Sequence, residues 1–481
     1  MSVTAFHDTI VKGMKNERTM NQTTGMKDER GWPDGFKGDR VIVIIACLLM
    51  LVSIISMFSS TSLLALEKRT DRVAIMYSQL KVVAFGALVI LGLYVFGGRR
   101  LYRLVGRLGF LLSLGMLLVL TFKLDLGFVK AGHINGAWRV IVVFGLQLHV
   151  YELVKVLMIL YLAWALDTYK EGECRLSGWL ASLSPKLAFL DEPFWQKCLY
   201  LYVPVAVTLG LVMLGSNSSA IFIATILVLL IVIGGVHLKD IIGLGLGLAL
   251  VVLLLFGAHK AGILKINRFD TALERITSNE KALLDTLVKY RPGGESYDAE
   301  IFNETRDKLQ QTVSAKLAIK EGGIFGKGVG NSTQKYVVPV IFGDYMFSFI
   351  IEETGGVGAF FIIILYFSLL ARGALVAKDC DNYFEKIVVA GLSILVTGQA
   401  FMHMMVNVHF PFVPQTGQTL PLVSHGTSSF LVFSTVFGIL LSISRQTNSK
   451  MQERAAKAMR IIGHEESETT GEEDRYDTEN Q

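Results

Sequence analysis

The sequence has few charged residues for its length. Only 18% of its 481 residues are charged and 52% are hydrophobic, whereas a typical soluble domain has about 25% charged residues. The apolar residues form long blocks and lack both the helical period of about 3.6 residues and the two-residue period of a half-buried strand. These absences exclude an ordinary soluble domain and indicate an all-α, polytopic membrane protein.

Cysteines are also few, and none is spaced for metal or redox chemistry. Of the four, Cys47 lies in an apolar run, while Cys174, Cys198 and Cys380 lie in or near segments that we place on the cytoplasmic side. No two of them form a CxxC pair. We therefore expect unpaired thiols, with neither a metal nor a redox centre.

Features of secreted and nucleic-acid-binding proteins are lacking as well. The first forty residues are polar and contain no short apolar segment with a small-residue cleavage site. We therefore expect no cleaved signal peptide and an uncleaved first span. The net charge of +5 is interpreted as attraction to anionic membrane lipids, without a nucleic-acid partner.

What is abundant is membrane-spanning sequence, because ten apolar runs approach the length of about 20 residues that crosses a bilayer. They are residues 41–61, 79–98, 104–122, 147–167, 199–214, 218–236, 241–258, 346–371, 386–406 and 426–444. Lysines and arginines gather on one side of these spans, in residues 1–40, 99–107, 168–197, 372–378 and 445–460. Under the positive-inside rule, both termini are cytoplasmic.

This topology divides the chain into three parts. Residues 1–40 form a cytoplasmic extension, 41–445 the membrane domain and 446–481 a cytoplasmic tail. We expect a short basic helix over about 445–463. From Glu465 on the tail is acidic and has no apolar anchors, so we expect disorder there.

One large loop, residues 259–345, lies outside the membrane in this topology. The spacing of apolar residues in "KINRFDTALERITSNEKALLDTLVKY" predicts amphipathic helices against the membrane face. "RPGGESYDAE" predicts a turn, and a second helix is expected over about 298–320. Loops of this length are commonly functional or disordered.

The second helix leads into the glycine-rich stretch "KEGGIFGKGVGNSTQ". Glycines such as Gly322 and Gly323 let backbone amides approach a phosphate closely, and Lys327 adds a positive charge. The alternative is a tight re-entry turn packed on neighbouring helices. The GxxxxGK[ST] spacing of an ATP-binding loop is absent.

Three carboxylates stand out in the stretch that follows. Asp344 precedes a long apolar run, where it is either a functional group or a helix cap. Glu352 and Glu353 lie eight and nine positions further on, a little over two helical turns into the span. Two adjacent carboxylates at that depth cannot both face lipid, so at least one faces the interior.

Several cations are candidate partners for these carboxylates or for a substrate. Glu152 and Lys155 are three positions apart in a span and share a helix face, as an ion pair or as a substrate contact. Arg139, Arg268 and Arg275 lie outside in this topology. Each is either solvated or able to meet a pyrophosphate.

The stretch "FPFVPQTGQTLPLVSHGTSS", residues 410–429, contains three prolines that prevent a continuous helix. Non-helical backbone at membrane depth is tolerated where it lines a cavity or is buried in protein. We expect this stretch to form a wall of the outward-facing site. His425 is a proton carrier or a structural hydrogen-bonding group.

Five ordered pieces of the sequence resemble one protein family. They are "NGAWRVI", "ELVKVLMILYLA", "AIKEGGIFGKGVGNSTQ", "FGDYMFSFIIEETGGVGA" and "TGQTLPLVSHGTSS" with the later "GILLSISR". In their order and spacing they are similar to the shape, elongation, division and sporulation family, over residues 38–445. The family's aspartate motif falls on Asp344, and its acidic pair falls on Glu352 and Glu353.

The resemblance implies ten transmembrane helices in the bacterial inner membrane and polymerisation of peptidoglycan glycan strands. It also implies lipid II, a disaccharide-pentapeptide on undecaprenyl pyrophosphate, as substrate, and a class B penicillin-binding transpeptidase as partner. Within the matched pieces it adds Asn331, Ser332, Gln334 and Ser424 to the candidate substrate-binding residues. The polar extensions at both ends resemble the division members of the family, which implies divisome partners and the septum.

The sequence departs from the family pattern at several positions near these motifs. The departures are Phe342 and Gly343 before the aspartate, Thr354, His149-Val-Tyr before Glu152, and His425-Gly-Thr. The large loop also lacks the family's usual Asp-Pro stretch. Asp344, the glycine-rich segment and Lys155 remain in place.

Glycan polymerisation needs a base for the attacking hydroxyl and cations for the leaving pyrophosphate. We expect Asp344 to act as the base or to orient the acceptor. Lys155, Arg139, Arg268 or the glycine-rich amides would hold the pyrophosphate, with a divalent cation, Mg²⁺ or Mn²⁺, as a further expectation. Glu352 and Glu353 would position Asp344 or pair with Lys155.

Two other functions suit the same pattern. The first is a flippase for the same lipid precursor, and the second is a scaffold without catalytic activity that activates its transpeptidase. A role in cell elongation is the alternative to one in division.

Overall fold

The computed structural model describes residues 36–479 with gaps. The gaps are 62–64, 66–68, 70, 126, 128, 135–136, 144, 237–238, 240–242, 244, 246–252, 255–256, 258–279, 295, 338–341, 411–412 and 414–416. The predicted span 241–258 lies largely outside the described residues, as do Arg268 and Arg275.

Helices dominate the described part of the chain, as predicted. The long ones are α2 (Arg40–Ser60), α4 (Arg72–Phe96), α5 (Arg99–Thr121), α6 (Val150–Glu171), α9 (Val203–Gly215), α10 (Asn217–Ile233), α14 (Ala299–Gly322), α15 (Met346–Asp379), α16 (Tyr383–Asn407) and α17 (Thr427–Glu479). Each of the predicted spans other than 241–258 overlaps one of these helices. Among the described residues, seven helical segments are long and apolar enough to cross a membrane. The chain is therefore a polytopic, all-α membrane protein.

A small sheet, which the sequence analysis missed, precedes α6. β1 (Val129–Ile134), β2 (Ala137–Val143) and β3 (Leu146–His149) form an antiparallel sheet in chain order. β2 is rich in β-branched residues, and only two residues separate it from β1, as in a tight hairpin. The helix predicted over 147–167 therefore begins three residues later than expected, at Val150, because residues 146–149 form β3.

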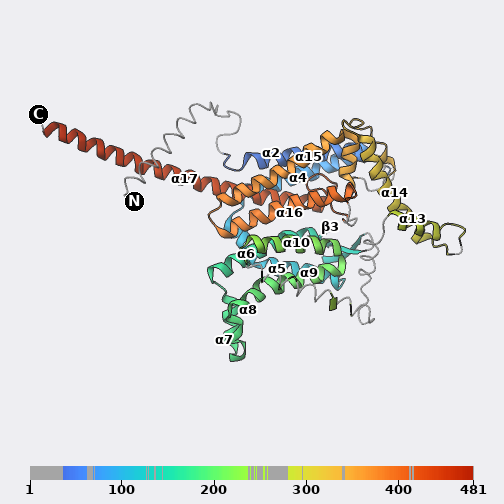
Figure 1. The fold of residues 1–481 in the computed structure, drawn as a ribbon, viewed down its shortest axis with the longest axis horizontal. Helices are drawn as coiled ribbons and strands as arrows, with labels where there is room; N and C mark the ends of the chain where they lie inside the picture. The colour runs from blue at the N-terminus through green and yellow to red at the C-terminus, as the bar shows by residue number, and fades with distance from the viewer. Residues whose placement is uncertain are drawn as a thin grey trace.

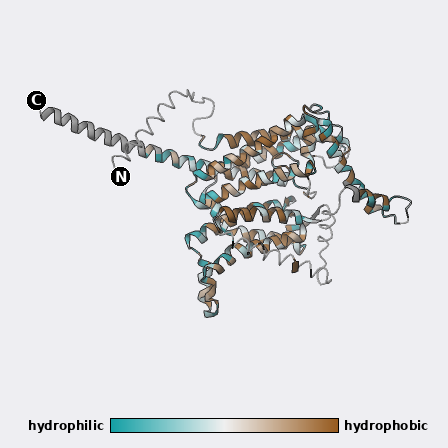
Figure 2. Cartoon of the chain, in the orientation of Figure 1, coloured by the Kyte–Doolittle hydropathy of each residue, from teal (hydrophilic) through white to brown (hydrophobic). Residues whose placement is uncertain are grey.

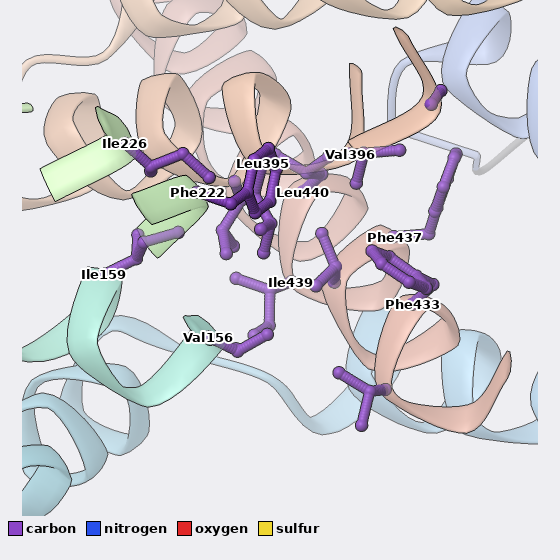
Figure 3. Close-up of a cluster of buried hydrophobic side chains, with 14 of the residues drawn as sticks. Val156, Ile159, Phe222, Ile226, Leu395, Val396, Phe433, Phe437, Ile439 and Leu440 are labelled. Atoms are coloured by element: carbon purple, nitrogen blue, oxygen red, sulfur yellow. The ribbon is translucent and has the colours of Figure 1, made fainter. Parts of the chain in front are cut away.

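The long helices run side by side, and the sheet lies at the opposite end of the bundle from the start of α2 (Figure 1). Hydrophobic residues follow the helices through the bundle, whereas hydrophilic ones gather toward its two ends (Figure 2). Between α6, α10, α16 and α17 the core is filled by large apolar side chains (Figure 3). The labelled ones are Val156, Ile159, Phe222, Ile226, Leu395, Val396, Phe433, Phe437, Ile439 and Leu440.

Two glycines of α5 hold α6 close. A Cβ at Gly106 would lie 2.7 Å from the carbonyl oxygen of Leu160, and one at Gly109 would lie 2.6 Å from that of Leu157. Small residues at a helix contact let two backbones approach, and dispersion then stabilises the pair. This contact fixes the position of α6, the helix that carries Glu152 and Lys155.

The outer segment contains α13 (Glu280–Lys289) and α14, joined by a turn. α14 covers the predicted helix over 298–320, and the Asp298 side chain caps it by accepting hydrogen bonds from the amides of Glu300 and Ile301. Gly323 ends it with a φ of +53°, a conformation that glycine adopts without strain.

The tail differs from the prediction. α17 continues from the bundle as one helix to Glu479, whereas the sequence predicted a helix only over about 445–463. Glu and Arg are good helix formers, and a helix that already exists in the bundle extends without the cost of a new nucleus.

Candidate functional site

Asp344 lies in the turn just before α15, but it is not the N-cap residue of that helix. The N-terminal cap of α15 is Tyr345, with no side-chain cap bond. Asn407 takes part in both neighbouring contacts, since its Nδ2 donates to the carbonyl of Asp344 at 2.9 Å and its Oδ1 accepts from the amide and hydroxyl of Ser348 at 2.9 and 2.8 Å. The side-chain carboxyl of Asp344 therefore does not cap the helix, and only its backbone carbonyl takes part in these contacts.

The surroundings of Asp344 change its acidity. The residue is half-buried, and loss of water around the carboxyl raises its pKa to about 6, an effect that the positive charge of Arg139 partly offsets. Within the described part of the chain, the carboxyl makes no hydrogen bond. A carboxylate with a pKa this close to neutrality is suited to accept a proton.

The predicted wall over 410–429 does contact Asp344. A Cβ at Gly417 would lie 2.8 Å from Oδ2 of Asp344, so only a glycine fits there without displacing the carboxyl. Ser424 fastens the wall, because its Oγ donates to the carbonyl of Gly343 at 2.8 Å and accepts from the amide of Leu420 at 3.0 Å. Ser424 therefore supports the site from within the protein.

His425 makes the hydrogen bonds expected of a structural group. Its amide donates to the carbonyl of Phe342 at 2.9 Å, and its ring Nδ1 lies 3.1 Å from Oε1 of Gln79. These contacts clamp the wall to the turn before Asp344.

Lys155 is buried, with 2% of its surface exposed. Its Nζ donates to Glu152 at 2.8 Å and to Gln399 at 2.5 Å, and it lies 3.4 Å from Oε1 of Gln418. The ion pair with Glu152 matches the shared helix face predicted from the sequence. Gln418 is the neighbour of Gly417, so Lys155 reaches the wall that meets Asp344.

A buried row of polar residues on α16 completes this connection, and the sequence analysis overlooked it. Gln399, His403 and Asn407 recur every four residues and are almost fully buried. His403 Nδ1 is 2.6 Å from the carbonyl of Gln418, and its Nε2 accepts from the amide of Phe347 at 3.3 Å. A polar stripe with helical spacing in an apolar span was the available signal.

The glycine-rich segment is a packed turn against a break in α15. At Gly355 the helix departs to φ +69° and ψ −168°. The carbonyls of Glu352 and Glu353 accept instead from the amides of Lys327 and Gly328, both at 2.9 Å. In return, the amides of Gly356 and Val357 donate to the carbonyls of Gly323 and Ile324 at 2.9 and 3.2 Å.

The turn thus supplies the hydrogen bonds that one turn of α15 gives up. Contact is so close that a Cβ at Gly322 would lie 2.1 Å from the carbonyl oxygen of Ile351. The amides of Gly326, Lys327, Gly328 and Gly330 all donate within the protein. This geometry favours the packed turn over a phosphate cradle.

Both inner glutamates are buried in this region, with 0% and 3% exposed for Glu352 and Glu353. Glu352 accepts from Lys327 Nζ at 2.9 Å, Ser332 Oγ at 2.5 Å and the amide of Thr333 at 2.7 Å.

Glu353 accepts from the hydroxyl of Ser59 on α2 and from the amide of Gly330 at 3.0 Å. The predicted pairing of either glutamate with Lys155 is therefore wrong. Residues of the glycine-rich turn bind both glutamates, and Lys155 pairs with Glu152.

The remaining candidates of this stretch belong to the same cluster. Asn331 Nδ2 donates to the carbonyl of Lys327 at 3.0 Å, and the amide of Gln334 is 3.4 Å from Oε1 of Glu352. With Ser332 and Lys327 they surround Glu352, and none of their described bonds reaches Asp344.

The described residues contain no group of three or more His, Cys, Asp or Glu that could hold a metal ion. Mg²⁺ often binds through one or two carboxylates together with substrate phosphates. Within the described residues, Asp344 offers one carboxylate for binding of that kind.

Comparison with known proteins gives the family. The sequence model described as cell cycle protein, FtsW/RodA/SpoVE, matches residues 39–449.

Among relatives, the probable peptidoglycan glycosyltransferase FtsW of Trichlorobacter lovleyi is 27% identical over 84% of this chain and 93% of its own length. Stage V sporulation protein E of Bacillus subtilis is 26% identical over 85% of this chain and 97% of its own length. A shorter match to FtsW of Caulobacter vibrioides is 35% identical but spans only 34% of that protein.

Solved structures share the fold. A chain of a peptidoglycan synthase complex that coordinates polymerization and crosslinking superposes with a TM-score of 0.57 at 21% identity, covering 86% of this chain and 99% of that one. RodA of Thermus thermophilus gives a TM-score of 0.50 at 22% identity, covering 86% and 98%. With a family match over most of its length, the chain belongs to the FtsW/RodA/SpoVE family of cell cycle proteins.

Proposed function

We propose that this protein is a peptidoglycan glycosyltransferase that polymerises lipid II into glycan strands. The observation that carries the proposal is Asp344, a half-buried carboxyl that the wall residue Gly417 approaches closely and whose pKa burial raises to about 6 against the opposing charge of Arg139. Names of full-length relatives in the same family, such as the FtsW of Trichlorobacter lovleyi, support the same activity.

The reaction joins an acceptor hydroxyl to the anomeric carbon of a donor sugar. As the hydroxyl oxygen forms the new glycosidic bond, its proton passes to Asp344. The bond from the anomeric carbon to undecaprenyl pyrophosphate breaks at the same centre. A base with a pKa near the working pH contributes about 10²–10⁴-fold to such a step.

Negative charge develops on the departing pyrophosphate, so nearby cations stabilise the transition state. Arg139 is the described cation whose charge acts on Asp344, and we assign the pyrophosphate to it. Lys155 donates to Glu152 and Gln399. Through its contact with Gln418 it stabilises the wall over 410–429. Arg268 and Arg275, outside the described residues, stay candidates for the same role.

A divalent cation, Mg²⁺ or Mn²⁺, belongs to the proposal as well. Asp344 would hold it, and because a bound cation lowers the pKa of its carboxylate ligand, Asp344 would then orient the acceptor in place of acting as the base. When bound, the cation would neutralise charge on the substrate phosphates.

The cellular setting is also proposed. A class B penicillin-binding transpeptidase would crosslink the strands that this protein makes, since a structural relative is part of a complex that coordinates polymerization and crosslinking. Most of the named relatives are FtsW proteins, which favours division, with divisome partners at the septum of the bacterial inner membrane. Imaging a tagged copy tests this, because a signal along the side wall would indicate elongation.

The activity test uses purified protein with its transpeptidase and lipid II. Wild type should form polymer, and Asp344→Ala and Asp344→Asn should not. Full polymer from either variant rules out Asp344 as the base. Translocation of lipid II in sealed vesicles without polymer would indicate a flippase, and an active transpeptidase with no polymer from wild type would indicate a scaffold.

A further inference from the structure

The connection between α6 and α9 leaves the bundle sideways. It contains α7 (Arg175–Leu183), η1 (Pro185–Asp191), α8 (Pro193–Lys197) and η2 (Cys198–Tyr202). In Figure 1, α7 and α8 extend across the direction of α5 and α9, at the end of the bundle from which α17 leaves. Because it joins two helices of the membrane bundle, this connection lies where the bilayer meets water.

α7 presents an apolar face that the described part of the chain leaves exposed. Leu176, Trp179 and Leu183 recur at helical spacing and are 48%, 59% and 58% exposed, so they lie on one side of the helix. The other side faces the protein, because Ser177 is fully buried and its hydroxyl lies 3.3 Å from Oδ1 of Asp191 in η1. An exposed face of this kind is unfavourable in water.

Aromatic residues after α7 extend the same kind of surface. Phe194 is 60% exposed and Trp195 is 40% exposed. Trp195 packs edge-on against Phe194 and Phe189, with ring centroids 5.6 and 4.9 Å apart. Exposed tryptophan and phenylalanine beside membrane spans are typical of residues at the lipid headgroup level.

The connection is fastened to α6 and is therefore not free to fold its apolar face inward. Tyr161 of α6 donates to the carbonyl of Tyr200 at 2.9 Å, and Tyr200 in turn accepts from the amide of Leu176 at 2.9 Å. Gln196 donates to the carbonyl of Asp191 at 3.0 Å. The face is held outward by contacts on the opposite side.

We propose that α7 and the aromatic residues of η1 and α8 form an amphipathic foot, residues 175–197, which inserts into the adjacent lipid leaflet. α9, which follows the foot directly in the chain, also exposes apolar side chains, with Val203 50% and Val207 38% exposed. The foot therefore continues an apolar surface of the membrane bundle, and this continuity favours lipid over a protein partner. Helices of this kind lie in the membrane plane with the apolar face about 5–10 Å into the headgroup and acyl boundary. By its bonds to α6, the foot fixes the depth of the helix that carries Lys155.

Tryptophan fluorescence of the full-length protein in lipid vesicles tests the foot. The signal of Trp179 is taken as the difference between wild type and Trp179→Phe. Lipids brominated near the headgroup end of the acyl chain should quench it about twofold more than lipids brominated near the chain end, because insertion is shallow. Aqueous iodide should leave it unchanged.

The opposite result overturns the proposal. If iodide quenches Trp179 while both brominated lipids do not, the foot lies in water and is free for a protein partner. This readout is independent of glycan polymerisation, so it stands or falls apart from the proposed enzyme activity.

Adjacent positions on α7 give a matched control. Leu183→Lys places a charge on the apolar face and should expose Trp179 to iodide, whereas Ser182→Lys, on the polar edge, should leave the quenching as in wild type. Both residues are exposed, so both variants should fold. Equal effects of the two substitutions would contradict the assignment of the lipid-facing side.

Discussion

Asp344 and Glu352 lie eight positions apart, yet their surroundings are opposite. Glu352 is fully buried and accepts hydrogen bonds from Lys327, Ser332 and Thr333. Asp344 is half-buried, and within the described residues its carboxyl has no hydrogen bond and only the positive charge of Arg139 to favour ionisation. A carboxylate whose bonding capacity is filled stabilises a structure, and one that is left unsatisfied can exchange a proton.

The largest expected effect is on activity, from Asp344→Asn. Loss of the base should lower polymerisation about 10²–10⁴-fold, while the melting temperature at pH 7.5 should stay the same or rise, since an enclosed ionised carboxylate is unfavourable. Polymerisation assays and thermal melts of the same preparations measure both. A large drop in melting temperature would place Asp344 with the structural carboxylates.

The next effect is on stability, from Glu352→Gln. A neutral amide accepts less strongly than a carboxylate from Lys327, Ser332 and Thr333, and hydrogen bonds to a charged group contribute about 1.5–3 kcal/mol. Thermal or denaturant unfolding in detergent measures this loss.

Glu321→Gln is the matched control, because Glu321 also pairs with Lys327 but has 38% of its side chain exposed. Exposed pairs contribute about 0–1 kcal/mol, so this variant should unfold almost as wild type does. Equal losses in the two variants would show that burial does not distinguish them.

The pH dependence of polymerisation should be set by the protonation of Asp344. Its pKa is raised to about 6 in the folded protein, so protonation below that pH removes the base and polymerisation should fall about tenfold per pH unit. Stability changes in the opposite direction. The folded state binds this proton more tightly than the unfolded chain does, so the contribution of Asp344 to stability is present below its unfolded pKa and is lost as the pH rises through about 6. A flat activity profile between pH 5 and 7 would contradict the assignment.

The smallest effect is expected from Gly417→Ala. The new Cβ would meet Asp344 Oδ2 at 2.8 Å, and a displaced catalytic group lowers rates by up to about 10²-fold. Unfolding should change little, because Asp344 is only half-buried and makes no described hydrogen bond through its carboxyl that a shift would break. Gly426→Ala is the control, since its Cβ would meet nothing closer than 3.7 Å, and a similar loss of activity there would disprove the steric explanation.

Much of the fold was predictable because bilayer thickness fixes the length of a span. Runs of apolar residues located all the described long helices of the bundle except α14, which amphipathic spacing located instead. The sheet escaped because its strands are short and apolar, and such runs cannot be told from helix by period alone. The helix in the tail was not predicted, because an acidic composition without apolar residues shows only that the segment cannot form its own core. It does not show that a helix of the bundle continues into it.

The amino-acid sequence shows that Asp344, Lys155 and the two inner glutamates are ionisable groups in an apolar setting, which is energetically costly and therefore indicates a specific role. Which role each one has depends on the fold. It brought Gly417 and Arg139 to Asp344, and it filled the bonds of Glu352 with the glycine-rich turn. Helical spacing gives the depth of a carboxylate, but its charge state depends on donors that come from segments far away in the chain.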